Sequence, residues 1–241
     1  MRIDAIVEQA RLLQTLFDRT FEHAIDVGTD HGYVAERLLK RGYCRTLIAS
    51  DVAQGPLDNA MQTLKRYVES GKVTLVRSDG IRQIDVEGAD FAVIAGMGGD
   101  LISKIIEQSL DKALQIPFFI LQAMTEQTMM RETLSKHMTY LWDYFVTEGS
   151  RHYQITVFTT VPTDRLANYD QYQEKLLPHT PHRILEENRI PYCEHLNAKL
   201  HKIEKIIGFI REGRAKGSEQ LVREQQDKAN RIRSFLREVE D

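Results

Sequence analysis

The residues best suited to chemistry lie at positions 26–33, where the chain reads Asp-Val-Gly-Thr-Asp-His-Gly-Tyr. An apolar run leads into this segment and a helix-like run leaves it, so the pattern predicts a strand, a tight turn and a helix. Gly28 can adopt the positive φ that such a turn needs, and it lets a ligand approach the backbone closely. The helix that follows presents unpaired N–H groups and the positive end of its dipole. The segment therefore predicts a site for the polar part of a nucleoside-like cofactor.

The type of cofactor depends on Asp30. In the dinucleotide fingerprint G-x-G-x-x-G this position is a glycine, which lets a pyrophosphate approach the backbone. A carboxylate repels a diphosphate, but it suits the ammonium and hydroxyl groups of S-adenosylmethionine, which carries no phosphate. We therefore favour S-adenosylmethionine over a nicotinamide dinucleotide. The alternative is that Asp30 only caps the helix that follows.

Two further predicted strands are followed by an acidic residue. Asp51 follows a strand at residues 46–50, where a carboxylate can bind the two hydroxyls of a ribose. Asp79 and Gly80 come shortly after a strand at residues 73–76, and Asp79 could accept a hydrogen bond from an adenine amino group. Simpler alternatives are that Asp51 caps a helix and that the Asp-Gly pair is a plain turn.

A glycine-rich segment, Gly-Met-Gly-Gly at residues 96–99, follows the strand predicted at residues 91–95. Small residues at the carboxyl end of a strand let a flat substrate lie against the backbone, and ligands of open α/β sheets bind outside those ends. Met97 is the one bulky residue of this segment, and it either packs on a substrate ring or fills the core. The segment therefore predicts the acceptor side of the same site.

The order of the predicted elements indicates an α/β fold. Strands are expected at residues 23–27, 46–50, 73–76, 91–95 and 118–121, and helices at residues 3–17, 32–41, 56–69, 100–114 and 126–137. Residues 140–146 and 153–161 then form a closing β-hairpin, whereas a dinucleotide dehydrogenase usually continues with βα units. We predict a Rossmann-like, doubly wound sheet of seven strands with the last antiparallel, which is the class I methyltransferase plan.

The pattern changes after Pro162, so we predict a cofactor-binding domain at residues 1–162 and a helical domain at residues 163–241. The linking stretch contains four of the six prolines: Pro162, Pro178, Pro181 and Pro191. Apolar residues then repeat at coiled-coil-like spacing on both sides of a break at residues 213–217, which predicts two antiparallel helices. Their basic residues either form a solvated face or contact the phosphates of an RNA. These residues are Lys199, Lys202, Lys205, Arg211, Arg214, Lys216, Arg223, Arg231, Arg233 and Arg237.

Composition limits the class of protein but does not identify a substrate. The content of 42% hydrophobic and 28% charged residues is that of an ordinary globular protein. The formal net charge of −3 does not argue for nucleic-acid binding, which would depend on a local basic patch. Cys44 and Cys193 lie far apart without metal-ligand spacing, and the chain shows no signal sequence or long apolar segment. We expect a cytosolic (cytoplasmic) protein with reduced thiols, no structural metal and no membrane segment; the oligomeric state stays open.

Together these motifs resemble one family, the bacterial tRNA (adenine(22)-N1)-methyltransferases. The resemblance covers roughly residues 10–160 and rests on residues 26–33, Gly55-Pro56-Leu57, Asp79-Gly80, and residues 96–99 followed by Leu101-Ile102. The chain departs from the family at Ala35, where a proline is usual, and at Ala123-Met124, where Pro-Asn is usual. The second departure lies on the acceptor side.

The resemblance implies S-adenosylmethionine as methyl donor and N1 of an adenine in the D-loop region of tRNA as acceptor. The predicted donor site consists of Asp26, Gly28, Asp30, His31, Gly32, Asp51, Val52, Asp79, Gly80 and Gly96. The candidates for the acceptor slot are Tyr33, Met97, Gly98 and Gln122. Adenine N1 has an available lone pair, so no general base is expected. The alternatives are a methyltransferase for another RNA position or a small metabolite, and a non-catalytic adaptor that uses the coiled coil to bind a protein.

Overall fold

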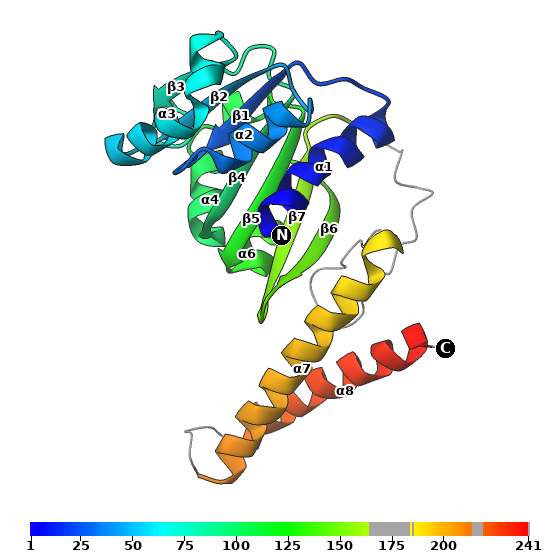
Figure 1. Ribbon diagram of the computed structural model, residues 1–241. Helices are drawn as coiled ribbons and strands as arrows, with labels where there is room; N and C mark the ends of the chain where they lie inside the picture. The colour runs from blue at the N-terminus through cyan, green and yellow to red at the C-terminus, as the bar shows by residue number, and fades with distance from the viewer. Residues whose placement is uncertain (164–183, 185, 214–218, 241) are drawn as a thin grey trace. The chain divides into compact units, whose positions relative to one another are not determined.

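The computed structural model describes residues 1–163, 184, 186–213 and 219–240 (Figure 1). Its strands are β1 (His23–Val27), β2 (Thr46–Asp51), β3 (Val73–Arg77), β4 (Phe91–Gly98), β5 (Phe118–Thr125), β6 (Thr139–Glu148) and β7 (Arg151–Thr159). Its α-helices are α1 (Arg2–Phe17), α2 (Tyr33–Lys40), α3 (Gln54–Glu69), α4 (Gly99–Glu107), α5 (Leu110–Ala113), α6 (Gln127–Leu134), α7 (Arg189–Arg211) and α8 (Glu219–Glu240).

The seven strands of the described residues form one sheet in the order β3-β2-β1-β4-β5-β7-β6 (Figure 1). β1 pairs in parallel with β2 and β4, and β4 pairs in parallel with β5. β7 runs antiparallel to β5, with Phe118 opposite Thr159. This topology confirms the predicted Rossmann-like, doubly wound sheet with its closing antiparallel strand. The strand order reverses between β1 and β4, and ligands of such sheets bind at the carboxyl ends of the strands at this point.

Both faces of the sheet are covered by helices, because successive side chains of a strand point to opposite faces. On one face, Ile25 of β1 joins a buried cluster with Ile106 of α4 and Leu134 of α6. On the other face, the ring of Phe17 at the end of α1 lies 4.7 Å from the ring of Phe118 on β5. α1 and α2 lie side by side in this layer (Figure 1). The core therefore holds the sheet edge that carries the predicted site in a fixed position.

Two boundaries differ from those that the sequence predicts. β4 continues through Gly98 with shifts in register, where the glycines predict a loop. The helix predicted at residues 100–114 is instead two helices, because Ser109 adopts a non-helical conformation with φ −135° and ψ 39°. A Cβ atom on Gly99 would lie 2.5 Å from the carbonyl oxygen of Glu126, so glycine allows α4 to begin this close to the backbone after β5.

The chain divides into two compact units. The first contains Met1–Asp143 and the described residues from Tyr153 to Thr163, and the second contains Tyr144–His152 together with α7 and α8. The first unit includes almost the whole sheet and all the predicted site residues. The domain boundary expected at residue 162 stays a prediction, since residues 164–183 lie outside the described part of the chain.

Within the second unit, α7 and α8 pack on each other as the predicted pair of helices. Their buried seam includes Ile203 and Ile207 of α7 and Ile232 and Leu236 of α8. Phe145 also belongs to this cluster, and its ring centroid lies 4.9 Å from that of Tyr192. Four residues singled out in the sequence lie outside the described residues: Pro178, Pro181, Arg214 and Lys216.

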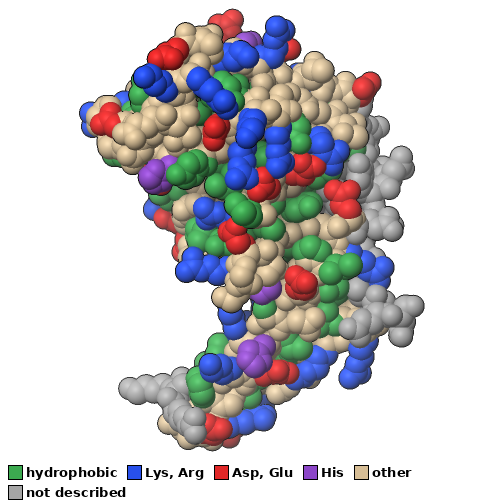
Figure 2. Space-filling model, in the orientation of Figure 1, with side chains coloured by type: hydrophobic (Ala, Val, Ile, Leu, Met, Phe, Trp, Pro, Cys, Tyr) green, Lys and Arg blue, Asp and Glu red, His purple; other side chains and the backbone are tan. Residues whose placement is uncertain are grey.

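The described residues include neither a helix suited to a membrane nor a cluster of side chains suited to a metal ion. None of their helices combines the length and apolar character that crossing a bilayer requires. No group of three or more His, Cys, Asp and Glu side chains among them could hold a metal ion. Figure 2 shows basic and acidic side chains interspersed on the visible face of the first unit, in keeping with the near-neutral charge of the sequence.

Candidate functional site at the carboxyl edge of the sheet

The turn after β1 has the conformation that its residue types predict. Gly28 has a φ of +75°, in the left-handed region that favours glycine. The N–H groups of Gly28 and Thr29 both donate to the carbonyl oxygen of Ser50, over 2.8 and 2.9 Å. These two hydrogen bonds tie the turn to the end of β2, so the side chains of residues 26–33 are held at the carboxyl edge of the sheet.

A pocket of about 380 Å³ opens at this edge, over the ends of β1, β2, β4 and β5. Eight of its lining residues are among those that the sequence predicts: Asp26, Gly28, Asp30, His31, Tyr33, Asp51, Gly96 and Met97. Three of the eight carry carboxylates. The pocket lies where the strand order reverses, which is the expected position for a nucleoside-containing ligand in this class of sheet.

Asp26 is the buried carboxylate of this pocket, with 3% of its surface exposed. The hydroxyl of Thr29 donates to Asp26 Oδ2 over 2.7 Å. Burial raises the pKa of Asp26 to about 6, and the nearby charge of Asp51 adds to the rise, while the hydrogen bond from Thr29 opposes it. A cationic ligand group beside Asp26 would favour the ionised carboxylate. Asp26 is therefore suited to bind an ammonium or sulfonium group.

Asp30, His31 and Tyr33 form the exposed rim of the pocket. Asp30 has a φ of +47°, and its Oδ2 lies 3.7 Å from His31 Nε2. The His31 and Tyr33 rings stack with their centroids 5.5 Å apart and their planes at 15°. α2 begins after Gly32 without a side-chain cap, so Asp30 is not the helix cap that the sequence left open. Asp30 instead lines the pocket beside His31.

Asp51 ends β2 at the other side of the pocket. Its Oδ1 accepts a hydrogen bond from the N–H of Ala53 over 3.0 Å. Ala53 is the residue that precedes α3, and that helix also has no side-chain cap. The Asp51 carboxylate is thus oriented by the backbone two residues further on, and it remains partly exposed to the pocket.

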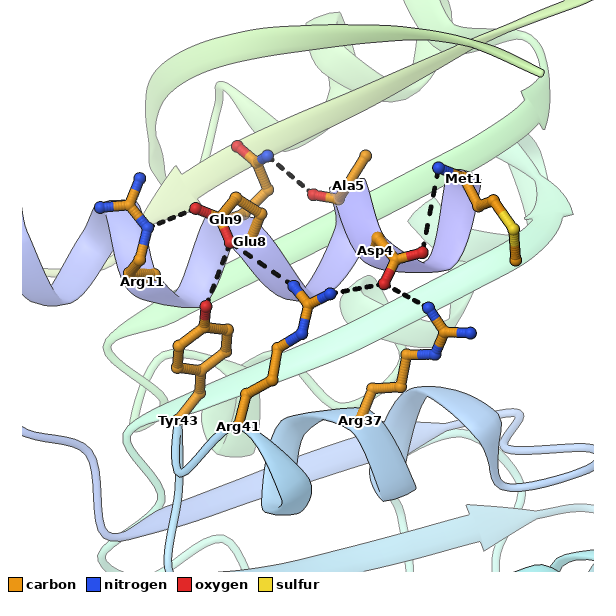
Figure 3. A network of polar contacts seen from close by, with 9 residues as sticks. All are labelled: Met1, Asp4, Ala5, Glu8, Gln9, Arg11, Arg37, Arg41 and Tyr43. Atoms are coloured by element: carbon orange, nitrogen blue, oxygen red, sulfur yellow. Dashed lines mark hydrogen bonds and ion pairs between the residues drawn. The ribbon is translucent and has the colours of Figure 1, made fainter.

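Polar contacts between α1 and α2 fix the position of α1 beside the pocket (Figure 3). Asp4 pairs with Arg37 and with Arg41, the latter over 2.6 Å. Glu8 accepts a hydrogen bond from the hydroxyl of Tyr43 over 3.1 Å. The hydrogen bond from Arg37 lowers the pKa of Asp4, so this carboxylate is ionised in the neutral range. The network places the amino-terminal turns of α1 where they can line the pocket.

Comparison with known proteins identifies the class of site. Residues 10–156, more than half of the chain, match the family model described as "Methyltransferase domain". The chain belongs to this methyltransferase domain family. The tRNA (adenine(22)-N(1))-methyltransferase of Bacillus subtilis is 29% identical over 164 residues, which are 67% of this chain and 68% of that protein. The matched region of the family model includes all the predicted site residues of the methyltransferase domain.

Solved structures agree on the fold of the methyltransferase domain and of the helices that follow. M. capricolum TrmK, in complex with S-adenosyl-homocysteine, superposes with a TM-score of 0.73 at 20% identity, covering 99% of this chain and 97% of that one. The B. subtilis m1A22 tRNA methyltransferase TrmK gives a TM-score of 0.69 at 25% identity, covering 95% and 97%. The likeness thus extends over nearly the full length of both chains.

Six predicted residues of the methyltransferase domain do not line the pocket: Gly32, Val52, Asp79, Gly80, Gly98 and Gln122. The Asp79 carboxylate pairs with Arg82 over 2.9 Å instead of facing the ligand side. Gln122 is fully buried, and its Nε2 donates to the carbonyl oxygen of Ala123 over 3.0 Å. Roles for these residues in binding stay predictions.

Seven other residues line the pocket although the sequence does not predict them as site residues: Arg2, Ile3, Ile6, Thr29, Val34, Ala95 and Met124. Thr29 lies within the motif at residues 26–33, where its hydroxyl could have been recognised as a partner for Asp26. Arg2, Ile3 and Ile6 belong to α1, whose apolar period predicts a helix but not the packing that brings it to the pocket. No sequence signal links these α1 residues to the site.

Proposed function

We propose that this protein is an S-adenosylmethionine-dependent methyltransferase that modifies N1 of an adenine in tRNA, at position 22. The observation that carries the proposal is an acidic pocket in a methyltransferase domain, at the point where the strand order reverses. The B. subtilis relative of this chain is a tRNA (adenine(22)-N(1))-methyltransferase. A pocket with three carboxylates at this position suits a ligand that has an ammonium, a sulfonium and a ribose but no phosphate. A transfer-RNA substrate is also consistent with a cytoplasmic enzyme.

The residues present fit this donor. Gly28 supplies the positive φ that the turn needs, and the terminal methyl of Met97, itself a pocket residue, fills the space where a side chain would lie. Asp51, at the end of β2, would bind the ribose hydroxyls, as acidic residues do at this position in related sheets. Asp26 and Asp30 would face the ammonium of the amino-acid end and the sulfonium. Asp79 would reach the adenine amino group only after leaving Arg82, so its role is the least supported of the four.

The chain's task in the reaction is to position the acceptor. When bound, S-adenosylmethionine would supply a methyl group that its sulfonium already makes electrophilic. Adenine N1 has a lone pair and no proton to lose, so in-line placement is the main requirement. The Tyr33 ring and the Met97 side chain line the pocket, and they could support an adenine ring that has left its stack. Gly98 follows Met97 and would complete the acceptor slot. Gln122 is fully buried, so it would act there only by positioning Met124, whose sulfur lies 3.5 Å from Gln122 Nε2.

The product adenine is cationic, so negative charge near the acceptor would stabilise the transition state. Asp30 is the exposed carboxylate closest in sequence to Tyr33, and its position on the rim allows this electrostatic role. The second unit would contact other parts of the tRNA through basic residues on the exposed faces of α7 and α8.

The deciding experiment incubates the purified protein with methyl-labelled S-adenosylmethionine and unmodified tRNA transcripts that carry adenine or guanine at position 22. We expect label in the adenine transcript, recovered as 1-methyladenosine by mass spectrometry, and none in the guanine transcript. Equal labelling of both transcripts would show a different RNA position. Label transferred only to small molecules from an extract would overturn the RNA proposal. An absence of donor binding in calorimetry would leave only the adaptor alternative.

A further inference from the structure

Arg2 is the one Arg or Lys among the described residues that line the pocket. It begins α1, and its guanidinium lies over the ring of Tyr153, 5.2 Å from the ring centroid. Arg2 Nη1 also lies 3.6 Å from the sulfur of Met124. These contacts orient the guanidinium, but a thioether is a weak acceptor and an aromatic face accepts no strong hydrogen bond.

No ion pair within the described part of the chain includes Arg2. Arg37 and Arg41, by contrast, both pair with Asp4, which lies two residues after Arg2 in the first turn of α1. A guanidinium presents five N–H donors in a planar fork that matches a carboxylate or a phosphate. Arg2 is therefore an oriented cation whose strong donors have no anionic partner among the described residues. The other ionisable side chains of its pocket are three carboxylates, the His31 imidazole and the Tyr33 phenol.

The position of Arg2 along the pocket indicates which part of a ligand it would meet. Arg2 contacts Met124 on β5, whereas Asp51 ends β2. The sheet order β2-β1-β4-β5 separates these two strands by three strand spacings, or roughly 14 Å. Asp26 on β1 lies between them in this order. A ligand whose ribose lies at Asp51 would thus extend past Asp26 towards Arg2.

We propose that Arg2 binds the carboxylate of the amino-acid end of S-adenosylmethionine. This inference rests on the proposed function and deepens it. The amino-acid end is a zwitterion, and Asp26 with Arg2 gives the pocket the two opposite charges that a zwitterion needs. A phosphate of the RNA backbone is the other anion that Arg2 could bind. The carboxylate is favoured because Arg2 lines the same pocket as three acidic residues. Those residues repel any anion, but the amino-acid end brings an ammonium that they attract, whereas a phosphodiester brings only negative charge.

The test compares two ligands that differ by one carboxylate: S-adenosylhomocysteine and its decarboxylated analogue, which keeps the amine, the sulfur and the nucleoside. Binding of each is measured by calorimetry for the wild-type protein, for Arg2→Met and for Arg2→Lys. Methionine keeps an unbranched apolar stem over Tyr153 and removes the charge. Arg11→Met is the matched control, because Arg11 lies on the same helix, is exposed and pairs with Glu8 outside the pocket (Figure 3).

We expect Arg2→Met to bind S-adenosylhomocysteine about 10- to 100-fold more weakly, which is the usual range for a lost charged hydrogen-bond pair. Arg2→Lys should show a smaller loss, since it keeps the charge but not the fork. The decarboxylated analogue should bind wild type and Arg2→Met equally. Arg11→Met should behave as wild type with both ligands.

Several outcomes would overturn the assignment. Equal losses for both ligands in Arg2→Met would mean that Arg2 supports the pocket without meeting the carboxylate. Unchanged donor affinity with a raised KM for tRNA would assign Arg2 to an RNA phosphate. If Arg2→Met does not fold, the wild-type protein still decides, because equal affinity for the two ligands contradicts the proposal. Failure of wild type to bind S-adenosylhomocysteine at all would instead reject the proposed function.

Discussion

The terminal methyl group of Met97 occupies the space that a Cβ atom would take on Gly28. Met97 comes from the glycine-rich end of β4, and Gly28 begins the turn after β1. The Met97 side chain packs against the core cluster on the α4 face and also lines the pocket. The two alternatives that the sequence left open for Met97, core packing and ligand contact, are therefore not exclusive. Through this contact, the segment at residues 96–99 packs directly against the turn at residues 26–33.

Gly28→Ala should affect ligand binding more than stability. The new methyl group would push the flexible end of Met97 into the pocket, and the positive φ would cost about 1–2 kcal/mol of unfolding free energy. Gly42→Ala is the control, because Gly42 has a φ of +70° and open space around its Cα. We expect similar losses of stability for both variants in urea unfolding, but weaker binding of S-adenosylhomocysteine for Gly28→Ala alone. Adding Met97→Ala should restore part of the binding; no recovery would contradict the displacement of Met97.

Asp26 should make the stability of the protein depend on pH in a particular direction. Its pKa of about 6 in the folded state lies above the ordinary value of 3.8, so folding favours its protonated form. Its contribution to the unfolding free energy is most favourable below about pH 4, is lost as the pH rises through 6, and stays lost above that. Asp26→Asn should therefore be more stable than wild type at pH 8, by on the order of 2–3 kcal/mol.

The measurement is urea unfolding of wild type and Asp26→Asn from pH 4 to pH 8. The quantity to compare is the difference between their free energies of unfolding at each pH. Other carboxylates titrate in both proteins and cancel in this comparison. Asp58→Asn serves as control, because Asp58 is exposed on α3 and accepts a hydrogen bond only locally from Gln54. A difference between Asp26→Asn and wild type that does not change with pH would show that the Asp26 charge is not what costs stability. Asp26→Asn should also weaken donor binding.

Asn188 should be essential for the packing of the second unit. It is fully buried, and its side-chain amide donates to the carbonyl oxygen of Phe145 over 2.8 Å and accepts from the Phe145 N–H over 2.5 Å. Asn188→Asp would face that carbonyl with an acceptor, and we expect a loss of about 2–4 kcal/mol from the unsatisfied buried groups. Circular dichroism during urea unfolding reports the helices. Asn197→Asp, at an exposed site of α7, should leave the urea midpoint unchanged. If both variants lower the midpoint equally, or neither lowers it, the Asn188 hydrogen bonds to Phe145 do not stabilise the second unit.

Charge reversal on the helices of the second unit should separate tRNA binding from donor binding. The changed residues are Lys199, Lys202 and Arg231, each to Glu. We expect tRNA affinity to fall at least about tenfold near 0.15 M salt, with a shallower salt dependence, because contacts to phosphates release counterions. Affinity for S-adenosylhomocysteine should not change. Fluorescence anisotropy with labelled tRNA measures the first quantity and calorimetry the second.

An equal change of charge elsewhere is the control for that experiment. Arg45 and Lys72 precede β2 and β3, and Lys40 ends α2, so all three lie at the amino edge of the sheet, opposite the pocket. Their replacement by Glu should leave tRNA affinity close to wild type at this salt concentration. If both triple variants lose affinity equally, the effect is one of net charge. If neither loses affinity, the basic residues of α7 and α8 form a solvated face.

Much of the architecture follows from local sequence alone. The alternation of β-rich runs with amphipathic periods predicts the order of strands and helices, because strand and helix periods differ and each needs one apolar face. The closing hairpin predicted at residues 140–146 and 153–161 and the acidic turn at residues 26–33 distinguish a methyltransferase sheet from a dinucleotide-binding one. Asp26, Asp30 and Asp51 were predictable as one site, because the carboxyl ends of parallel strands meet at one edge.

Tertiary packing decided the rest. Arg2 lines the pocket because ion pairs of Asp4 and Glu8 hold α1 against α2, and such pairs between distant segments leave no mark in local sequence. Asp51 is the last residue of β2 and Asp79 lies two residues beyond β3, but the Asp79 carboxylate pairs with Arg82 and does not line the pocket. The side chains around each carboxylate decide which of the two is available to a ligand. Local residue types thus determine which chemical groups reach the sheet edge, and three-dimensional packing determines which of them face a common ligand.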